Sequence, residues 1–305
     1  MRAGDGKDSV FRRSSERGFR IAPWRWAALY GCGALLAISA FGQEAASLEE
    51  VLARADGTFA RRYVEEEMID AIALHEAAVA LLAPSEIERQ AFVLNRLAQL
   101  CYEATTFSPG DTEEDRLLFE RGRAAGLESL RLNPDYATIE DDDFRRAVSH
   151  VSDAAALLWT ANNWGGLLGM SPIEGLLHVG KVRALYERCL EVDEAYWGAS
   201  AHNALGAMLV VTPGPFGGDP DAGIAHLERA VSLAPDYQIN RVVRAQYLGF
   251  RFDLFGRIAA VRDAEFIEAE LSAVLAGAIE PWPFWNREAA KEAEALLAIL
   301  VEMSP

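Results

Sequence analysis

The residues best suited to hold a metal ion are spread widely along this chain. Its histidines are His75, His150, His178, His202 and His226. A zinc site needs histidine, cysteine or carboxylate ligands that come together at short, regular spacings. None of these histidines makes such a close pair with a carboxylate or a cysteine. We therefore expect no metal ion, and nothing in the sequence indicates another cofactor.

Two loops resemble sites for ions or phosphates but lack the necessary residues. The segment from Asp219 to Glu228 is similar to a calcium loop, yet Gly223 stands at the third ligand position and Ile224 at the required glycine. Residues 214–218 are rich in glycine but lack the lysine and the serine or threonine of a phosphate-binding loop. This segment is better explained as a turn that enters a helix at Asp219.

Nucleophilic catalysis finds no support in the sequence either. There is no Gly-x-Ser-x-Gly elbow, and no pairing of cysteine with histidine stands out. We expect the protein not to be an enzyme. A hydrolase with dispersed catalytic groups is the alternative, and it would require a nucleophile, a base and oxyanion donors within reach of one another.

A group of aromatic, amide and imidazole side chains is the best candidate for a binding site. Such a mixture can line a cavity that has an apolar wall and a few polar fixing points. The same residues could instead fill the interfaces between helices. Both interpretations stay open, and the two are compatible. The residues are Trp159, Asn162, Asn163, Trp164, Tyr196, Trp197 and His202.

The sequence around these side chains predicts helices that pack in pairs. Residues 195–211 and 221–237 suit one helical hairpin of the tetratricopeptide kind, joined by a loop at 212–220. Small residues would let the two helices approach, leucines would fill the seam, and a proline would end the second helix. An ordinary hairpin with chance alanines is the alternative. The residues with these roles are Leu205, Gly206, Gly223, Leu227, Ala230 and Pro235.

The end of this hairpin recurs elsewhere in the chain. Residues 129–136 match residues 230–237, and a third copy at 184–196 has Glu194 in place of the proline. The three endings, at positions 134, 194 and 235, are 60 and 41 residues apart instead of a regular 34. We therefore predict an all-α fold of stacked, tetratricopeptide-like hairpins that form a curved superhelix, with insertions between Asp135 and Lys181.

The remaining helices follow from hydrophobic periodicity and from capping or terminating residues. A short first helix is expected to end at Gly57, and a second one to end before Pro84. No stretch alternates long enough to predict a strand. The expected ranges are Leu48–Asp56, Glu86–Tyr102, Asn240–Arg257, Glu265–Ala276 and Asn286–Glu302.

The first 42 residues differ in character from the rest. Several arginines precede an apolar run from Trp26 to Ala40, and Ala40-Phe41-Gly42 suits a cleavage site. We predict an export signal at 1–42 and one helical-repeat domain at 43–305, with a periplasmic location. An uncleaved membrane anchor or a misassigned start codon is the alternative. Cys32 lies in a sequence similar to a bacterial lipobox, but the apolar run continues past it, so lipid anchoring is disfavoured.

The charge balance of the chain argues against some classes of binding partner. The chain has 29 Lys and Arg against 46 Asp and Glu, a net charge of −17. Loss of residues 1–42 would remove seven basic and three acidic groups and leave −21. Such a surface repels nucleic acid and anionic membranes and favours a basic partner. Cys101 and Cys189 lie in alanine-rich helical stretches, which favours two buried thiols over a disulfide.

Taken in order, five segments resemble those of the TRAP-transporter-associated T-component (TatT) family. They are Leu157–Trp164, Val182–Asp193, Gly198–His202, Gly217–Ala222 and Asn286–Arg287 before an alanine-leucine helix. The resemblance extends from about residue 47 to the C-terminus. It implies an exported all-α protein whose hairpins surround a central pore or cavity. Members of this family are typically lipoproteins, and the poor lipobox of this chain departs from that pattern.

The resemblance also implies a partner. A member of the family would work beside the periplasmic solute-binding protein of a tripartite ATP-independent periplasmic (TRAP) transporter and would handle a hydrophobic ligand. The alternative is a general tetratricopeptide scaffold for protein–protein interaction in the cell envelope. The two differ in their partners, which a pull-down from envelope extract would separate.

Overall fold

The computed structural model of the chain describes residues 47–108, 110, 112–253 and 257–303. The expected export signal and Cys32 lie outside these residues. The described part is built almost wholly of helices, which confirms the all-α prediction. The helices are α3 Leu48–Ala60, α4 Glu65–Leu81, α5 Ile87–Ala104, α6 Glu113–Arg131, α7 Pro134–Ile139, α8 Phe144–Ser149, α9 Ala154–Met170, α10 Pro172–Val192, α11 Tyr196–Val211, α12 Pro220–Leu233, α13 Ile239–Gly249, α14 Ala264–Leu275 and α15 Pro283–Met303.

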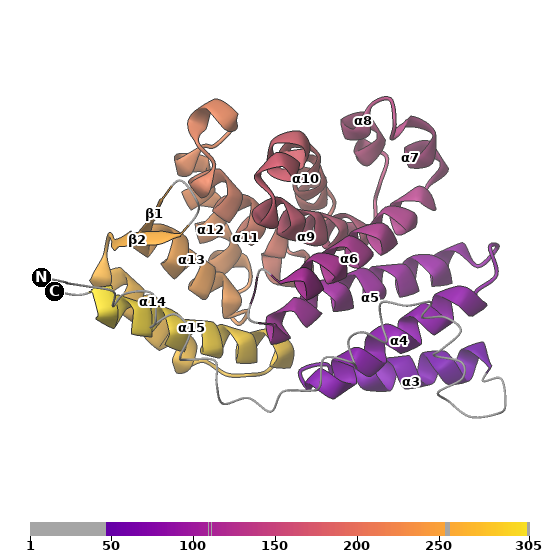
Figure 1. Ribbon diagram of the computed structural model, residues 1–305, viewed down its shortest axis with the longest axis horizontal. Coiled ribbons are helices and arrows are strands. Elements are labelled where there is room, and N and C mark those ends of the chain that lie inside the picture. The colour runs from indigo at the N-terminus through magenta and orange to yellow at the C-terminus, as the bar shows by residue number, and fades with distance from the viewer. Residues whose placement is uncertain (1–46, 109, 111, 254–256, 304–305) are drawn as a thin grey trace, which may run out of the picture.

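The helices form a curved succession in which neighbours in sequence pack together. Figure 1 shows it running from the indigo α3 and α4, through α5, α6, α9 and α10, to the yellow α14 and α15. The short helix α8 falls inside the insertion predicted between Asp135 and Lys181, and α7 begins one residue before it. None of the described helices is long and apolar enough to cross a membrane. A helical-repeat fold is thus present, while a tetratricopeptide superhelix with a central pore stays a prediction.

Helices α11 and α12 pack closely through two glycines. A Cβ atom added at Gly206 would lie 2.8 Å from Leu227 Cγ and 2.9 Å from the carbonyl oxygen of Gly223. Conversely, a Cβ at Gly223 would lie 2.8 Å from the carbonyl oxygen of Gly206. Leu205, Leu227 and Ala230 are buried in this region, and α12 ends at Leu233, two residues before Pro235. Backbone-to-backbone contact of this kind requires residues without side chains.

Most predicted helix ends lie close to the observed ones, because polar side chains cap them. The hydroxyl of Ser47 accepts a hydrogen bond from the Glu50 amide at the start of α3, and Asp219 caps α12 through the Ala222 amide. The predicted end of the first helix at Gly57 is wrong, since α3 continues to Ala60. A glycine inside a helix costs only about 1 kcal/mol, and burial of Phe59 beyond it favours another turn.

The helix predicted over Asn240–Arg257 is also wrong in its second half. Helix α13 ends at Gly249, and an antiparallel pair follows, β1 Phe250–Phe252 with β2 Ile258–Val261. The cause is tertiary packing. Phe250 is fully buried, and a Cβ at Gly249 would lie 2.2 Å from Ile267 Cγ1. Strands this short leave no detectable alternation in the sequence.

Candidate functional site

A large cleft opens among the helices of the second half of the chain. It has a volume of about 1540 Å³ and is lined by α9, α10, α11, α13, the 212–216 loop, β1 and the residues that directly follow each of the two strands. Most of the side chains on its wall are apolar. They include Val182, Met208, Val211, Phe216 and Phe252. A space of this size and polarity suits an apolar organic molecule.

A smaller cavity of about 230 Å³ adjoins the cleft. Ala204, Ala207 and Tyr247 belong to the walls of both spaces, so the two meet at these residues. The inner cavity is more polar and aromatic than the cleft. Its other wall residues include Tyr102, Trp159, Asn162, Asn203, Tyr237, Gln246 and Trp285.

Two residues of the group expected at a binding site, Trp159 and Asn162, line the inner cavity. The side-chain oxygen of Asn162 accepts a hydrogen bond of 2.9 Å from the hydroxyl of Tyr186, which lines the outer cleft. Burial raises the pKa of Tyr186 well above its ordinary value, so its hydroxyl stays protonated and able to donate. This hydrogen bond therefore links the walls of the two spaces.

Asn163 and Trp164 point elsewhere. The amide nitrogen of Asn163 donates to the carbonyl oxygens of Ala98 at 2.8 Å and Trp159 at 2.7 Å, and its side chain fills the space beside Gly122. Trp164 packs against Phe144, with ring centroids 5.8 Å apart. Both belong to helix interfaces, which matches the packing interpretation of these two residues.

Trp197 lies in an aromatic cluster beneath the inner cavity. Its ring centroid is 5.4 Å from that of Trp159 and 5.5 Å from that of Trp282, while its sequence neighbour Tyr196 lies at 6.3 Å. Trp197, Gly198 and Ala199 all have left-handed backbone angles, with φ of 48°, 66° and 60°. Such angles cost roughly 1–2 kcal/mol for each residue with a side chain. The packed aromatic cluster must offset that strain.

His202 faces α12 instead of the cavity. Its Nδ1 lies 2.8 Å from Nδ1 of His226, and its Nε2 lies 3.5 Å from a carboxylate oxygen of Glu194. Only one of the two facing nitrogens can carry a proton in this contact. Burial lowers the pKa of both histidines. The charge of His202 lowers the pKa of His226 further. Within the described residues, no group of three or more ligands could hold a metal ion.

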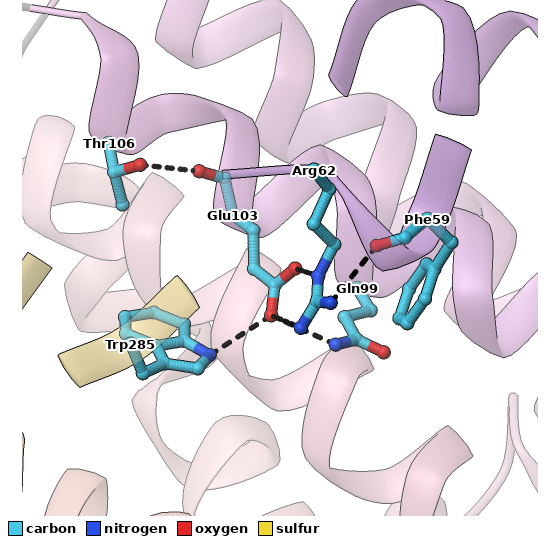
Figure 2. Close-up of polar contacts among 6 residues, drawn as sticks. All are labelled: Phe59, Arg62, Gln99, Glu103, Thr106 and Trp285. Atoms are coloured by element: carbon cyan, nitrogen blue, oxygen red, sulfur yellow. Dashed lines mark hydrogen bonds and ion pairs between the residues drawn. The ribbon is translucent and has the colours of Figure 1, made fainter. Parts of the chain in front are cut away.

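A buried ion pair behind the inner cavity was not predicted from the sequence. Figure 2 shows the carboxylate of Glu103, on α5, bonded to Arg62 from the α3–α4 turn and to Trp285 from α15. Arg62 Nε lies 2.5 Å from one carboxylate oxygen, and the Trp285 indole nitrogen donates to the other at 3.0 Å. Gln99 donates to the same oxygen at 2.9 Å. The group ties the first hairpin to the last helix and fixes Trp285 in the cavity wall.

Sequence signals for this group were weak. Glu103 lies one residue beyond the helix predicted to end at Tyr102, and its contact with Trp285 spans 182 residues. The nearest hint was Asn286, which the family resemblance included. Its side-chain oxygen accepts a hydrogen bond of 2.9 Å from the Gln238 amide, and its nitrogen donates to three carbonyl oxygens. Asn286 thus holds the start of α15 against the loop before α13.

The two cysteines of the described part of the chain add no reactive group to the cavities. Cys101 and Cys189 are free and fully buried, as expected for thiols inside helices. Burial raises the pKa of each thiol to about 12. Both therefore stay protonated at neutral pH, and a protonated thiol is a poor nucleophile.

Comparison with known proteins supports the resemblance seen in the sequence. The family described as TRAP transporter T-component matches residues 89–299. This stretch contains the walls of both cavities and Glu103, whereas Arg62 lies before it. A search of curated proteins found no match. The matched stretch covers more than half of the 305 residues. The chain therefore belongs to the family of TRAP transporter T-components.

Proposed function

We propose that this T-component is a periplasmic accessory protein that binds a hydrophobic ligand in its cleft and docks the solute-binding protein of its transporter. The observation that carries the proposal is the cleft of about 1540 Å³ with its largely apolar wall. An apolar cavity of this size stabilises an apolar guest by removing its surface from water. Trp159 and Asn162 would supply the aromatic and polar contacts at the inner end.

The docking part of the proposal rests on the rim of the cleft. Phe216 and Val211 belong to its wall and are 63% and 42% exposed. Large apolar side chains exposed together favour contact with another protein. A partner seated on this rim would cover the opening of the cleft, so the ligand could pass between the two proteins without entering water.

Binding of a TRAP-transporter solute-binding protein from the same source as this chain tests the docking. Phe216→Asp should weaken that binding by about tenfold or more, because it places a charge in the apolar contact. Val301→Asp is the matched control, since Val301 is 74% exposed on α15 and lies outside the cleft wall. Isothermal titration calorimetry would measure both. Failure of the wild-type chain to bind this partner, or equal losses in the two variants, would contradict docking at the rim.

A scaffold for other envelope proteins is the second candidate. A separate group of exposed apolar residues on α4 and α5 favours it, because Leu81, Ile87 and Phe92 are 41%, 53% and 48% exposed. A pull-down from envelope extract with wild-type chain and with Phe92→Asp, followed by mass spectrometry, distinguishes the two functions. The scaffold function would be indicated if the wild-type chain captured proteins that Phe92→Asp does not capture, and if the solute-binding protein were not among them.

A further inference from the structure

Two arginines at one end of the cleft have no carboxylate partner in the part of the chain that the structure describes. Arg251 lies on β1, and Arg262 directly follows β2. Both line the cleft, and both are exposed. Neither makes an ion pair with any residue that the structure describes. Their guanidinium groups are therefore available to a molecule that enters from outside.

The strand register places these two arginines on the same face of the β1–β2 pair. Phe250 pairs with Val261 and Arg251 with Ala260, so Arg262 stands diagonally across from Arg251. Alternate residues of a strand point to the same side, which puts Arg251 and Arg262 opposite the face of the buried Phe250. Two like charges on one face of a strand pair repel each other, and an anion between them would remove that repulsion.

Free arginines are unusual in this part of the molecule. Arg241 and Arg244 both bind the carboxylate of Glu270, and Arg257 on the same hairpin binds Asp253 at 3.1 Å. The whole chain has 17 more acidic than basic groups, so carboxylates are plentiful. The absence of a partner at Arg251 and Arg262 among the described residues thus distinguishes the cleft end from its surroundings.

We propose that Arg251 and Arg262 bind the anionic head group of an amphipathic ligand whose apolar body occupies the cleft. This inference rests on the proposed ligand-binding function and names the class of ligand. Guanidinium groups bind carboxylates and phosphates through paired, charge-assisted hydrogen bonds. The ligand class is a free amphiphile with one head group of this kind, such as a long-chain carboxylate.

The apolar residues beside the arginines suit such a molecule. Tyr247 and Phe252 stack with their centroids 5.2 Å apart, and both line the cleft next to Arg251. Met208 lines the same space from α11, and Phe216 lines it from the loop that follows α11. A ligand with its head at Arg251 and Arg262 could extend its body along these side chains toward Ala207, where the inner cavity begins.

Calorimetric titration of the full chain with decanoate and with decanol tests the proposal, because the two probes differ mainly in their charge. The wild-type chain should bind decanoate more tightly than decanol. The double variant Arg251→Gln/Arg262→Gln should bind decanoate about tenfold to a hundredfold more weakly, as expected for loss of charge-assisted hydrogen bonds, and should bind decanol unchanged. Arg61→Gln is the control, since this side chain is 54% exposed and lies outside the walls of both cavities, and it should leave both affinities unchanged.

Three results would overturn this assignment. Equal affinity of the wild-type chain for the two probes, or an equal loss with Arg61→Gln, would contradict a head-group site while leaving a hydrophobic ligand in place. Binding to phosphatidylglycerol vesicles that is lost in the double variant would assign the arginines to a membrane surface instead of a free ligand. If the wild-type chain bound neither probe, the ligand-binding part of the proposed function would fail together with this inference.

Discussion

At the scale of single residues, Glu103 carries the most deeply buried carboxylate among the described residues. Its side chain is fully buried, and the side chain of Arg62 that pairs with it is 11% exposed. Removing a charge from water is costly unless a partner of opposite sign and further hydrogen bonds compensate. Trp285 and Gln99 supply those bonds. The carboxylate therefore holds together three segments that are distant in sequence.

Glu103→Gln should destabilise the protein by about 3 kcal/mol, because it leaves Arg62 as an uncompensated, nearly buried charge. Urea denaturation followed by circular dichroism would measure the free energy of unfolding. Glu113→Gln is the control, since Glu113 pairs with Arg116 at the surface with 68% of its side chain exposed, and the midpoint should not change. Equal midpoints for the two variants would contradict a stabilising role for the buried pair.

His75 makes stability depend on pH. The ring is buried, and its Nδ1 lies 2.8 Å from the carbonyl oxygen of Ala71. Burial lowers the pKa of His75 from 6.5 to about 4. Between these pH values the unfolded chain binds a proton that the folded chain does not, so stability is complete above pH 6.5 and is lost as the pH falls toward 4.

The free energy of unfolding should therefore decrease by about 2–3 kcal/mol through His75 alone as the pH falls across that interval. Urea denaturation at several pH values would measure this decrease. His75→Gln should show a smaller decrease than the wild-type chain, whereas His150→Gln, at an exposed position, should show the same decrease. An unchanged pH profile for His75→Gln would rule out this histidine as the cause.

At the scale of the elements, close helix packing fixes the wall of the cleft. Helix α11 contributes Ala204, Ala207 and Met208 to that wall and meets α12 through Gly206 and Gly223 on another side. A change at the glycines would therefore move the residues that line the cleft. Gly180 on α10 offers a comparison, because a Cβ added there would meet no other atom within 4 Å. A substitution at this position changes only the stability of the helix itself.

Gly206→Ala should destabilise the protein by about 1–3 kcal/mol, because the new methyl group would collide with the backbone of α12. Gly180→Ala on α10 should instead stabilise it by up to about 1 kcal/mol, since a Cβ there would meet nothing within 4 Å. Thermal and urea denaturation would compare the two. Stabilisation by Gly206→Ala would show that α11 and α12 are not in close contact at this position.

Sequence reasoning succeeded where the signal is local and failed where it is not. The glycines, leucines and proline of the α11–α12 hairpin lie within about 30 residues, and their spacing sufficed to predict two paired helices. The β1–β2 pair was missed because its strands have three and four residues. Asn162 and Asn163 look alike in sequence, yet successive helical residues point about 100° apart, so one lines the cavity and the other a helix interface.

At the scale of the whole molecule, the curved succession of helices leaves a space that the described residues do not fill. The inner cavity and the cleft meet at Ala204, Ala207 and Tyr247, and the Glu103 group supports the far wall through Trp285. The chain belongs to the family of TRAP transporter T-components. Contact of Trp159 and Asn162 with a ligand stays a prediction. Blocking the junction between the cleft and the inner cavity tests it.

The most direct test is calorimetric titration of decanol into wild-type chain and Ala207→Trp. Ala207 is half-buried at the junction of the two spaces, so an indole there should occupy the cleft without entering the packed core. The account predicts saturable binding by the wild-type chain and about tenfold or weaker binding by a folded Ala207→Trp variant. Absence of saturable binding in the wild-type chain, or equal affinity in the variant, would contradict a ligand site in the cleft.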